Sequence, residues 1–314
     1  MHELSGRPAA RWAWALAAFV LLLAGCAHAR APGPGDAGRL DVLAVEVFLA
    51  DIASNVGGDR IRVAALLPEG ADPHGYEPTP SDVRRVADCQ VLIVNGGGLE
   101  GFLERLLAGA GGQKAVIVAS DGLQSRTVEQ GHEGDPGHTG DPHFWLDPNL
   151  VLTYVENIRA GLSAVDPDGS ADYAVNAQAY GAELTALDAW IRDRVQTIPE
   201  ARRLLVTNHE SLGYYADRYG LRVVGTIIPS VSSGASPSAQ QMVELVEKIR
   251  ATGAPAVFLE SGSNPRLADQ LSSEAGILVV PGLYTHSPGS AGAGAGSYIG
   301  MMRANTLTIV EALQ

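Results

Sequence analysis

Four histidines lie just after apolar runs that are typical of β-strands. His209 directly follows the run 204–208, and His286 follows 278–280 and the short segment 283–285. The other two belong to a tripeptide, Asp-Pro-His, that occurs at 72–74 and again at 141–143. A single histidine is more often structural than a ligand. Neutral imidazole is, however, a common nitrogen donor to zinc and related divalent metals, so four histidines at strand ends predict a metal site.

The residues around these histidines suit a site that holds its rings firmly. The proline before His74 and before His143 restricts the backbone that leads to each ring. Nearby carboxylates could accept the second ring N–H and fix the tautomer, and the candidates are Glu77, Asp147 and Glu210. Spacing alone does not decide among the three.

Short apolar segments alternate with helical ones along most of the chain. Such alternation predicts parallel sheets covered on both faces, and polar residues at the carboxyl ends of the strands are then the best ligand candidates. We expect an N-terminal α/β lobe over 40–166, a linking helix over 167–198 and a C-terminal α/β lobe over 199–314. The expected strands are 40–48, 61–67, 91–95, 114–119, 203–207, 223–228, 256–259 and 277–280.

One helical pattern stands out by its length. After Asp166-Pro167, apolar residues recur at steps of three and four from Tyr173 to Val195, and Pro199 ends the pattern. Asp168 or Ser170 could cap its beginning. Roughly 28 residues at about 1.5 Å each span about 42 Å, which exceeds the width of one small domain, so we expect a rigid helix that joins two lobes. Two of the four histidines come from each lobe.

Composition limits the possible functions. The chain has 314 residues, 22 Lys and Arg against 35 Asp and Glu, and a formal net charge of −13. No strong basic field is available for phosphate backbones, which argues against nucleic acid as a partner. With 46% hydrophobic and 18% charged residues the protein is globular, and its two cysteines cannot form a disulfide scaffold.

The N-terminal segment predicts export. Arg7 and Arg11 precede an apolar run over 12–23, which is short for a bilayer span but fits the core of a signal peptide over 1–25. The run ends in Leu-Ala-Gly-Cys, which resembles the bacterial lipobox, so Cys26 is the expected lipidated residue, followed by a flexible tether over 26–39. A free-ended secretory signal or an anchor helix is the alternative. In each case the protein is located outside the cytoplasm, at the cell envelope.

Other functional classes leave weaker signals. Gly96, Gly98 and Gly101 match the G-x-G-x-x-G pattern of dinucleotide sites, and Asp121 follows the next strand, but an exported protein has little access to nicotinamide cofactors. A secreted zinc hydrolase would need an open coordination position for water, which four protein ligands do not leave. Adhesion through a lipid-anchored surface stays open as a third class.

Five segments, in order, resemble the zinc/manganese solute-binding lipoproteins of ABC importers. They are Asp-Pro-His-Gly-Tyr-Glu-Pro-Thr-Pro (72–80), Asn-Gly-Gly-Gly-Leu-Glu (95–100), Asp-Pro-His-Phe-Trp-Leu-Asp-Pro (141–148), Asn-His-Glu-Ser-Leu-Gly-Tyr-Tyr (208–215) and Tyr-Ile-Gly-Met-Met (298–302). The resemblance implies two α/β lobes joined by a long helix, metal in the cleft between them, and no enzymatic activity. It makes His74, His143 and His209 ligands. It also implies an ABC permease and its ATPase as partners, with the receptor itself a monomer.

The fourth ligand departs from the family pattern. That family usually has aspartate in a Tyr-Thr-Asp-Ser-like motif, whereas this chain reads Tyr-Thr-His-Ser at 284–287. If His286 ligates, the set is all imidazole, which favours Zn²⁺ over the alternative Mn²⁺. If it points away, three histidines and a water remain. The polar loop 129–141, with His132 and His138, is either a weak collector of ions or a solvated surface loop.

Overall fold

The computed structural model describes residues 2, 38–127, 140–290 and 294–314. Residues 40–314 form one compact unit, whose fold is described below. Apart from His2, the predicted signal peptide, the lipidation residue Cys26 and most of the tether lie outside the described residues. Most of the polar loop 129–141, including His132 and His138, also lies outside them.

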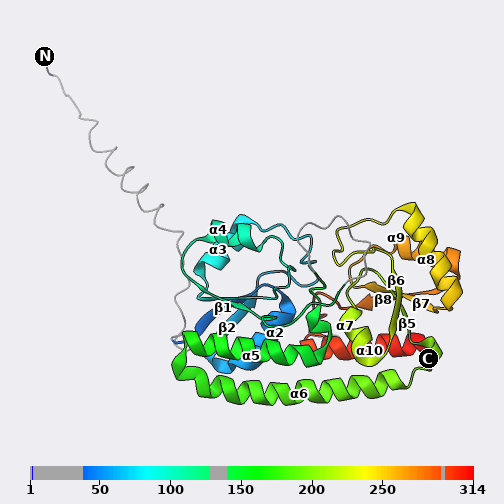
Figure 1. The fold of residues 1–314 in the computed structure, drawn as a ribbon. Helices are drawn as coiled ribbons and strands as arrows, with labels where there is room; N and C mark the ends of the chain where they lie inside the picture. The colour runs from blue at the N-terminus through cyan, green and yellow to red at the C-terminus, as the bar shows by residue number, and fades with distance from the viewer. Residues whose placement is uncertain (1, 3–37, 128–139, 291–293) are drawn as a thin grey trace. The chain divides into compact units, whose positions relative to one another are not determined.

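The first sheet is parallel and has four strands in the order β2-β1-β3-β4. Val42 of the central strand β1 pairs with Val63 on one side and with Val91 on the other. Helices α3 and α4 lie along one face of the sheet and α2 and α5 along the other (Figure 1). The bounds are β1 Leu40–Ala44, α2 Val47–Gly57, β2 Ile61–Ala65, α3 Pro80–Asp88, β3 Val91–Val94, α4 Leu103–Ala110, β4 Ala115–Val118 and α5 Pro148–Val165.

The predicted first strand, 40–48, is too long. It ends at Ala44, and Phe48 belongs to α2, which begins after the extended residue Glu46. The apolar run 42–49 is buried almost throughout because the strand and the first turn of the helix are both in the core. An apolar run of this kind carries no period that separates a buried strand from a buried helix.

The second sheet repeats the arrangement with the order β6-β5-β7-β8, again parallel. Helices α8 and α9 lie along one face, with α7 and α10 near the other (Figure 1). The apolar stripe of α8, from Met242 to Ile249, is buried, and Gly253 ends the helix in the left-handed conformation. The bounds are β5 Leu204–Thr207, α7 Gly213–Tyr219, β6 Arg222–Thr226, α8 Ala239–Thr252, β7 Ala256–Glu260, α9 Arg266–Ala275, β8 Leu278–Leu283 and α10 Tyr298–Leu313.

The long helix α6 runs from Ser170 to Gln196, as the periodicity predicted. All seven residues of its apolar stripe are buried: Tyr173, Ala177, Tyr180, Leu184, Leu187, Ile191 and Val195. The predicted caps were wrong, because neither the Asp168 nor the Ser170 side chain caps the first turn. Its beginning is held instead by Asp166, whose Oδ2 accepts hydrogen bonds from Arg60 Nε (2.9 Å) and Tyr173 Oη (2.7 Å).

A single hydrophobic core runs beneath both sheets. Successive residues of each strand point to opposite faces of the sheet. Leu92 packs in a small core under α3 and α4, and Leu204 packs in another under α8 and α9. Their neighbours Ile93 and Leu205 point the other way, into the common core. That core also contains the buried stripes of α2, α5, α6 and α10. The predicted fold class, two parallel-sheet α/β lobes joined by one long helix, is therefore confirmed, and the lobes share a packed base.

Because α6 stabilises this shared base, truncating its buried stripe should be costly. Leu187 is fully buried, so Leu187→Ala should lower the free energy of unfolding by about 2–5 kcal/mol. Val175 on the same helix is 67% exposed, so Val175→Ala should change the free energy of unfolding by less than about 0.5 kcal/mol. Urea titration of the metal-free proteins measures both. Equal effects of the two substitutions would contradict the packing role of this face.

Candidate metal centre

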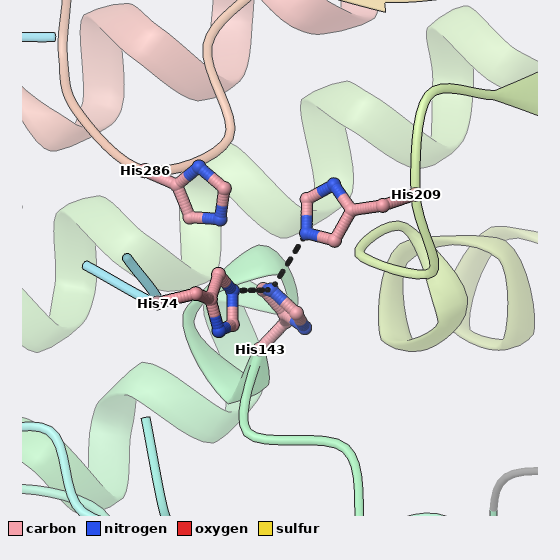
Figure 2. A group of neighbouring side chains, drawn as sticks. All are labelled: His74, His143, His209 and His286. Atoms are coloured by element: carbon pink, nitrogen blue, oxygen red, sulfur yellow. Dashed lines mark hydrogen bonds between the residues drawn. The ribbon is translucent and has the colours of Figure 1, made fainter. Parts of the chain in front are cut away.

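The four predicted histidines converge on one point (Figure 2). His143 Nε2 lies 3.2 Å from His74 Nε2 and 3.2 Å from His209 Nε2. One candidate ligand atom from each ring lies within 4.8 Å of all the others. Donor atoms bonded to one tetrahedral zinc at about 2.0–2.1 Å would lie about 3.3 Å apart, so the observed nitrogen spacing fits one small cation.

The rings also have the symmetry of a tetrahedral site. All six distances between the ring centroids fall between 5.0 and 5.7 Å, so the rings sit near the corners of a regular tetrahedron. His286 Nε2 is buried and has no hydrogen-bond partner among the described residues. A buried nitrogen without a partner is unfavourable unless something else occupies its lone pair, and a cation among the rings would do so.

The repeated Asp-Pro-His tripeptide has a local structural cause. Asp72 Oδ1 accepts the backbone N–H of His74 (2.9 Å), and Asp141 Oδ1 accepts that of His143 (3.0 Å). In both cases an aspartate two residues earlier in the chain closes a turn that fixes the backbone of the histidine. Asn95 supports the second turn further, because its side-chain amide donates to Pro142 O (3.1 Å).

Asp141 also contacts the ring of His143. Its Oδ1 lies 2.8 Å from His143 Nδ1, and both side chains are almost completely buried. A proton on Nδ1 leaves Nε2, the atom nearest the other rings, with its lone pair free for a metal. Burial raises the pKa of Asp141 to about 6, although the His143 amide and the Arg126 guanidinium both favour the carboxylate.

Glu260, at the end of β7, serves the C-terminal lobe in the same way. Its Oε1 lies 2.6 Å from His209 Nδ1 and accepts a hydrogen bond from Ser211 Oγ (3.2 Å), and its Oε2 lies 4.0 Å from His286 Nδ1. Burial alone would raise the pKa of Glu260, but the facing histidines lower it to about 2. Burial acts to lower the pKa of His209, but the Glu260 carboxylate outweighs it, so the pKa is raised. For His286 burial dominates and the pKa is lowered.

The sequence pattern predicted other carboxylates, Glu77, Asp147 or Glu210, as acceptors of the second ring N–H. Glu77 is exposed, Asp147 accepts the Asn149 amide at the start of α5 (2.8 Å), and Glu210 lines a separate cavity beside Arg222 and Lys248. The ring nitrogens instead face the carboxylates of Asp141 and Glu260. Asp141 was visible as the turn residue of its own motif. Glu260 could have been found because β7 pairs with β5, so its end lies next to His209.

The four histidines differ in their access to solvent. His143 and His209 are 0% exposed, while His74 and His286 are partly exposed. A cavity of about 300 Å³ opens on the side of His286 and is lined there by Glu69, Ser261 and Ser287. An ion would therefore reach the buried pair of rings past the accessible pair.

The glycine pattern 96–101 does not form an open phosphate site. The backbone amides of Asn95 and Gly96, which a phosphate would need, donate to the two carboxylate oxygens of Glu100 (2.5 and 3.1 Å). Burial raises the pKa of Glu100 to about 7 against these two hydrogen bonds. Burial and the neighbouring Glu100 raise the pKa of Glu46 well above its ordinary value. The loop therefore carries an internal carboxyl pair in place of a dinucleotide.

Residues 42–312 match the family described as "Zinc-uptake complex component A periplasmic". The chain belongs to this family. The match covers both sheets, α6 and all four clustered histidines, so the resemblance predicted from the five sequence segments is confirmed. The family consists of solute-binding receptors, which confirms the prediction that the protein is not an enzyme.

Relatives of this family cover nearly the whole chain. The manganese-binding lipoprotein MntA of Halalkalibacterium halodurans is 34% identical over 94% of this chain and 95% of its own length. The manganese ABC transporter substrate-binding lipoprotein scaA of Streptococcus gordonii is 32% identical over 95% and 96%. The solved structure of the periplasmic zinc-binding protein TroA from Treponema pallidum matches with a TM-score of 0.78 and 28% identity, covering 88% of this chain and 99% of that one.

Family and relatives confirm the expected location at the cell envelope, outside the cytoplasm. They also confirm, at the level of the family, a metal-binding receptor of an ABC importer. Within the described part of the chain, no helix has the length and apolar character needed to cross a membrane.

The buried carboxyl pair predicts a pH-dependent stability. The pKa values of Glu46 and Glu100 in the folded protein are raised above the unfolded value of about 4.3. The folded protein therefore binds more protons than the unfolded chain, and its stability falls as the pH rises above about 4.3. Glu46→Gln keeps the shape and removes one charge, so unfolding free energy of the metal-free protein should decline less between about pH 5 and pH 8. Glu104→Gln, on the exposed face of α4, is the control and should leave the parental slope unchanged. An unaltered slope in Glu46→Gln would contradict the pairing.

Proposed function

We propose that this protein captures Zn²⁺ through His74, His143, His209 and His286 and delivers it to an ABC permease that an ATPase drives. The observation that carries the proposal is the ring arrangement: nitrogens 3.2 Å apart and four centroids near the corners of a tetrahedron. Zn²⁺ accepts tetrahedral nitrogen ligands without a preference imposed by its d electrons.

Charge supports a divalent cargo. The four proposed ligands are neutral when they bind, so they cannot themselves balance a buried cation. Asp141 and Glu260, behind His143 and His209, supply two negative charges within hydrogen-bonding distance of the rings. Two carboxylates and one divalent ion make the buried group neutral, which lowers the desolvation cost of holding the ion.

Manganese is the second candidate, because both curated relatives above are named for manganese. Mn²⁺ favours oxygen ligands, and the aspartate usual at the fourth position of the family would provide one. Here that position is His286, whose ring lies 5.0–5.7 Å from the other three ring centroids. An all-imidazole set favours zinc.

Delivery requires more than spontaneous dissociation. Structural zinc sites reach apparent binding free energies of about 10–16 kcal/mol at neutral pH, so a permease must distort the site to release the ion. The ligands are divided between the lobes, and a small displacement of one lobe would lengthen some metal bonds and leave others unchanged. We further propose that the receptor is a monomer, anchored by a lipid on Cys26 after removal of residues 1–25.

The ligand set is tested by removing one of its two fully buried members. His143→Ala should weaken zinc binding by more than about 100-fold, beyond the 10–100-fold typical of losing an outer-shell partner. Glu77→Gln should bind zinc as the parent does, because that side chain is exposed to solvent. Metal analysis of the purified mature protein and chelator competition measure both. Parental affinity in His143→Ala would refute the site.

The choice of metal is tested at the fourth position. His286→Asp replaces a nitrogen donor by a harder oxygen, so the ratio of zinc to manganese affinity should fall by at least about tenfold. His286→Ala should weaken zinc without favouring manganese. Competition titrations of the two metals give these ratios. Equal zinc and manganese affinity in the parent protein would favour the manganese alternative, and unchanged zinc affinity in His286→Ala would remove this residue from the site.

A further inference from the structure

Arg126 lies outside the four histidines but reaches the carboxylate behind one of them. Its Nη1 is 3.2 Å from Asp141 Oδ2, while Asp141 Oδ1 faces His143 Nδ1 at 2.8 Å. The two oxygens of one buried carboxylate are thus divided between a guanidinium and a ring. Asp141 is 1% exposed and cannot draw equivalent support from solvent.

The backbone leaves a dedicated space for this guanidinium. A Cβ added at Gly213, the first residue of α7, would lie 1.8 Å from Arg126 Nη1 and 3.0 Å from Asp141 Oδ2. The first distance is shorter than any real Cβ contact and the second is tighter than most, so a side chain at position 213 would displace the guanidinium from Asp141.

Elements of the C-terminal lobe hold Arg126 in place. Its Nε donates to Asp217 Oδ2 (2.7 Å), and its backbone N–H donates to Tyr214 Oη (3.0 Å). Tyr214 in turn donates to Asp141 O (2.8 Å). Arg126 belongs to the segment after β4 and Asp217 to α7, so the guanidinium joins the N-terminal lobe to an exposed carboxylate of the other lobe.

We propose that Arg126 is a positioning residue for metal retention: it orients Asp141 toward His143 and connects that support to the surface of α7. This inference rests on the proposed function, specifically on ligation by His143. A guanidinium on Oδ2 fixes the carboxylate plane and keeps Oδ1 directed at His143 Nδ1. The ring is then held in the tautomer that presents Nε2 to the ion.

The arrangement makes His143 sensitive to the position of α7. A movement of α7 away from the N-terminal lobe would separate Asp217 and Tyr214 from Arg126. The Asp141 carboxylate behind His143 would then be held less firmly. A partner that contacts the exposed Asp217 would therefore affect His143, although that ring has no exposure to solvent.

The test is the rate of zinc loss from the purified mature protein, followed with a chromogenic chelator. Arg126→Gln should raise the dissociation rate about threefold, less than the roughly 10–100-fold expected for Asp141→Asn. Arg159→Gln is the matched control: Arg159 pairs with Glu156 on α5 and makes no contact with the site, so its rate should equal the parental rate. Circular dichroism checks that each variant is folded.

Three further measurements separate positioning from general destabilisation. Nitrogen-15 spectra of the imidazoles should show Nδ1–H of His143 in the parent and a weakened preference for that tautomer in Arg126→Gln. In the double variant Arg126→Gln/Asp141→Asn, zinc should dissociate as fast as from Asp141→Asn alone, because Arg126 acts through Asp141. Gly213→Ala, which displaces the guanidinium without removing it, should also speed dissociation.

The outcomes distinguish this inference from the proposed function. If His143→Ala binds zinc like the parent, the proposed site itself fails. If His143→Ala loses zinc but Arg126→Gln keeps the parental rate and tautomer, only the role of Arg126 is refuted. Additive effects in the double variant would also refute it, since they would show that Arg126 acts by a route other than Asp141.

Discussion

The spacing of four imidazole nitrogens depends on the hydrophobic base that both lobes share. Bonds from zinc to imidazole nitrogen vary by only about 0.1 Å, so the lobes must be held to a small tolerance for ligands from both to reach one ion. The common core provides this. Strand residues such as Ile93 and Leu205 pack from above onto the same cluster that contains the stripe of α6. Close packing resists gradual deformation, and lobe motion is therefore restricted to small rocking displacements.

On this base, each lobe carries half of the proposed metal site. The N-terminal half comprises His74, His143 and the carboxylate of Asp141, and the C-terminal half comprises His209, His286 and that of Glu260. Either half alone has two nitrogen donors and one negative charge, which is too little for tight binding of a divalent ion. Only the assembled cleft has four donors and two charges. Affinity is thus a property of the contact between the lobes, and a permease can control it by changing that contact.

Much of this architecture was predictable from local sequence patterns. The stripes of α6 and α8 follow a strict helical period, and His209 and His286 follow the carboxyl ends of β5 and β8. His143 does not follow a strand: β4 ends at Val118, and His143 immediately precedes the short helix Phe144–Leu146. Other features depend on pairings between distant segments. Glu260 reaches His209 only because β7 lies beside β5, and Arg126 reaches Asp141 only because Gly213 has no side chain. The glycine pattern at 96–101 was misleading because Glu100 satisfies the amides that a phosphate would otherwise bind.

The loop that carries His286 is tied to the opposite lobe, which constrains how the cleft can open. Trp145 Nε1, in the N-terminal lobe, donates to Thr285 O (2.7 Å), and Tyr298 Oη of α10 donates to Trp145 O (2.6 Å). Trp145 is itself fixed by stacking on Phe48, with ring centroids 4.6 Å apart. A displacement of the C-terminal sheet would therefore move His209 more readily than His286. Because His286 also lines a cavity of about 300 Å³, release from the proposed site would begin with the bond to His209 and leave His286 on the ion.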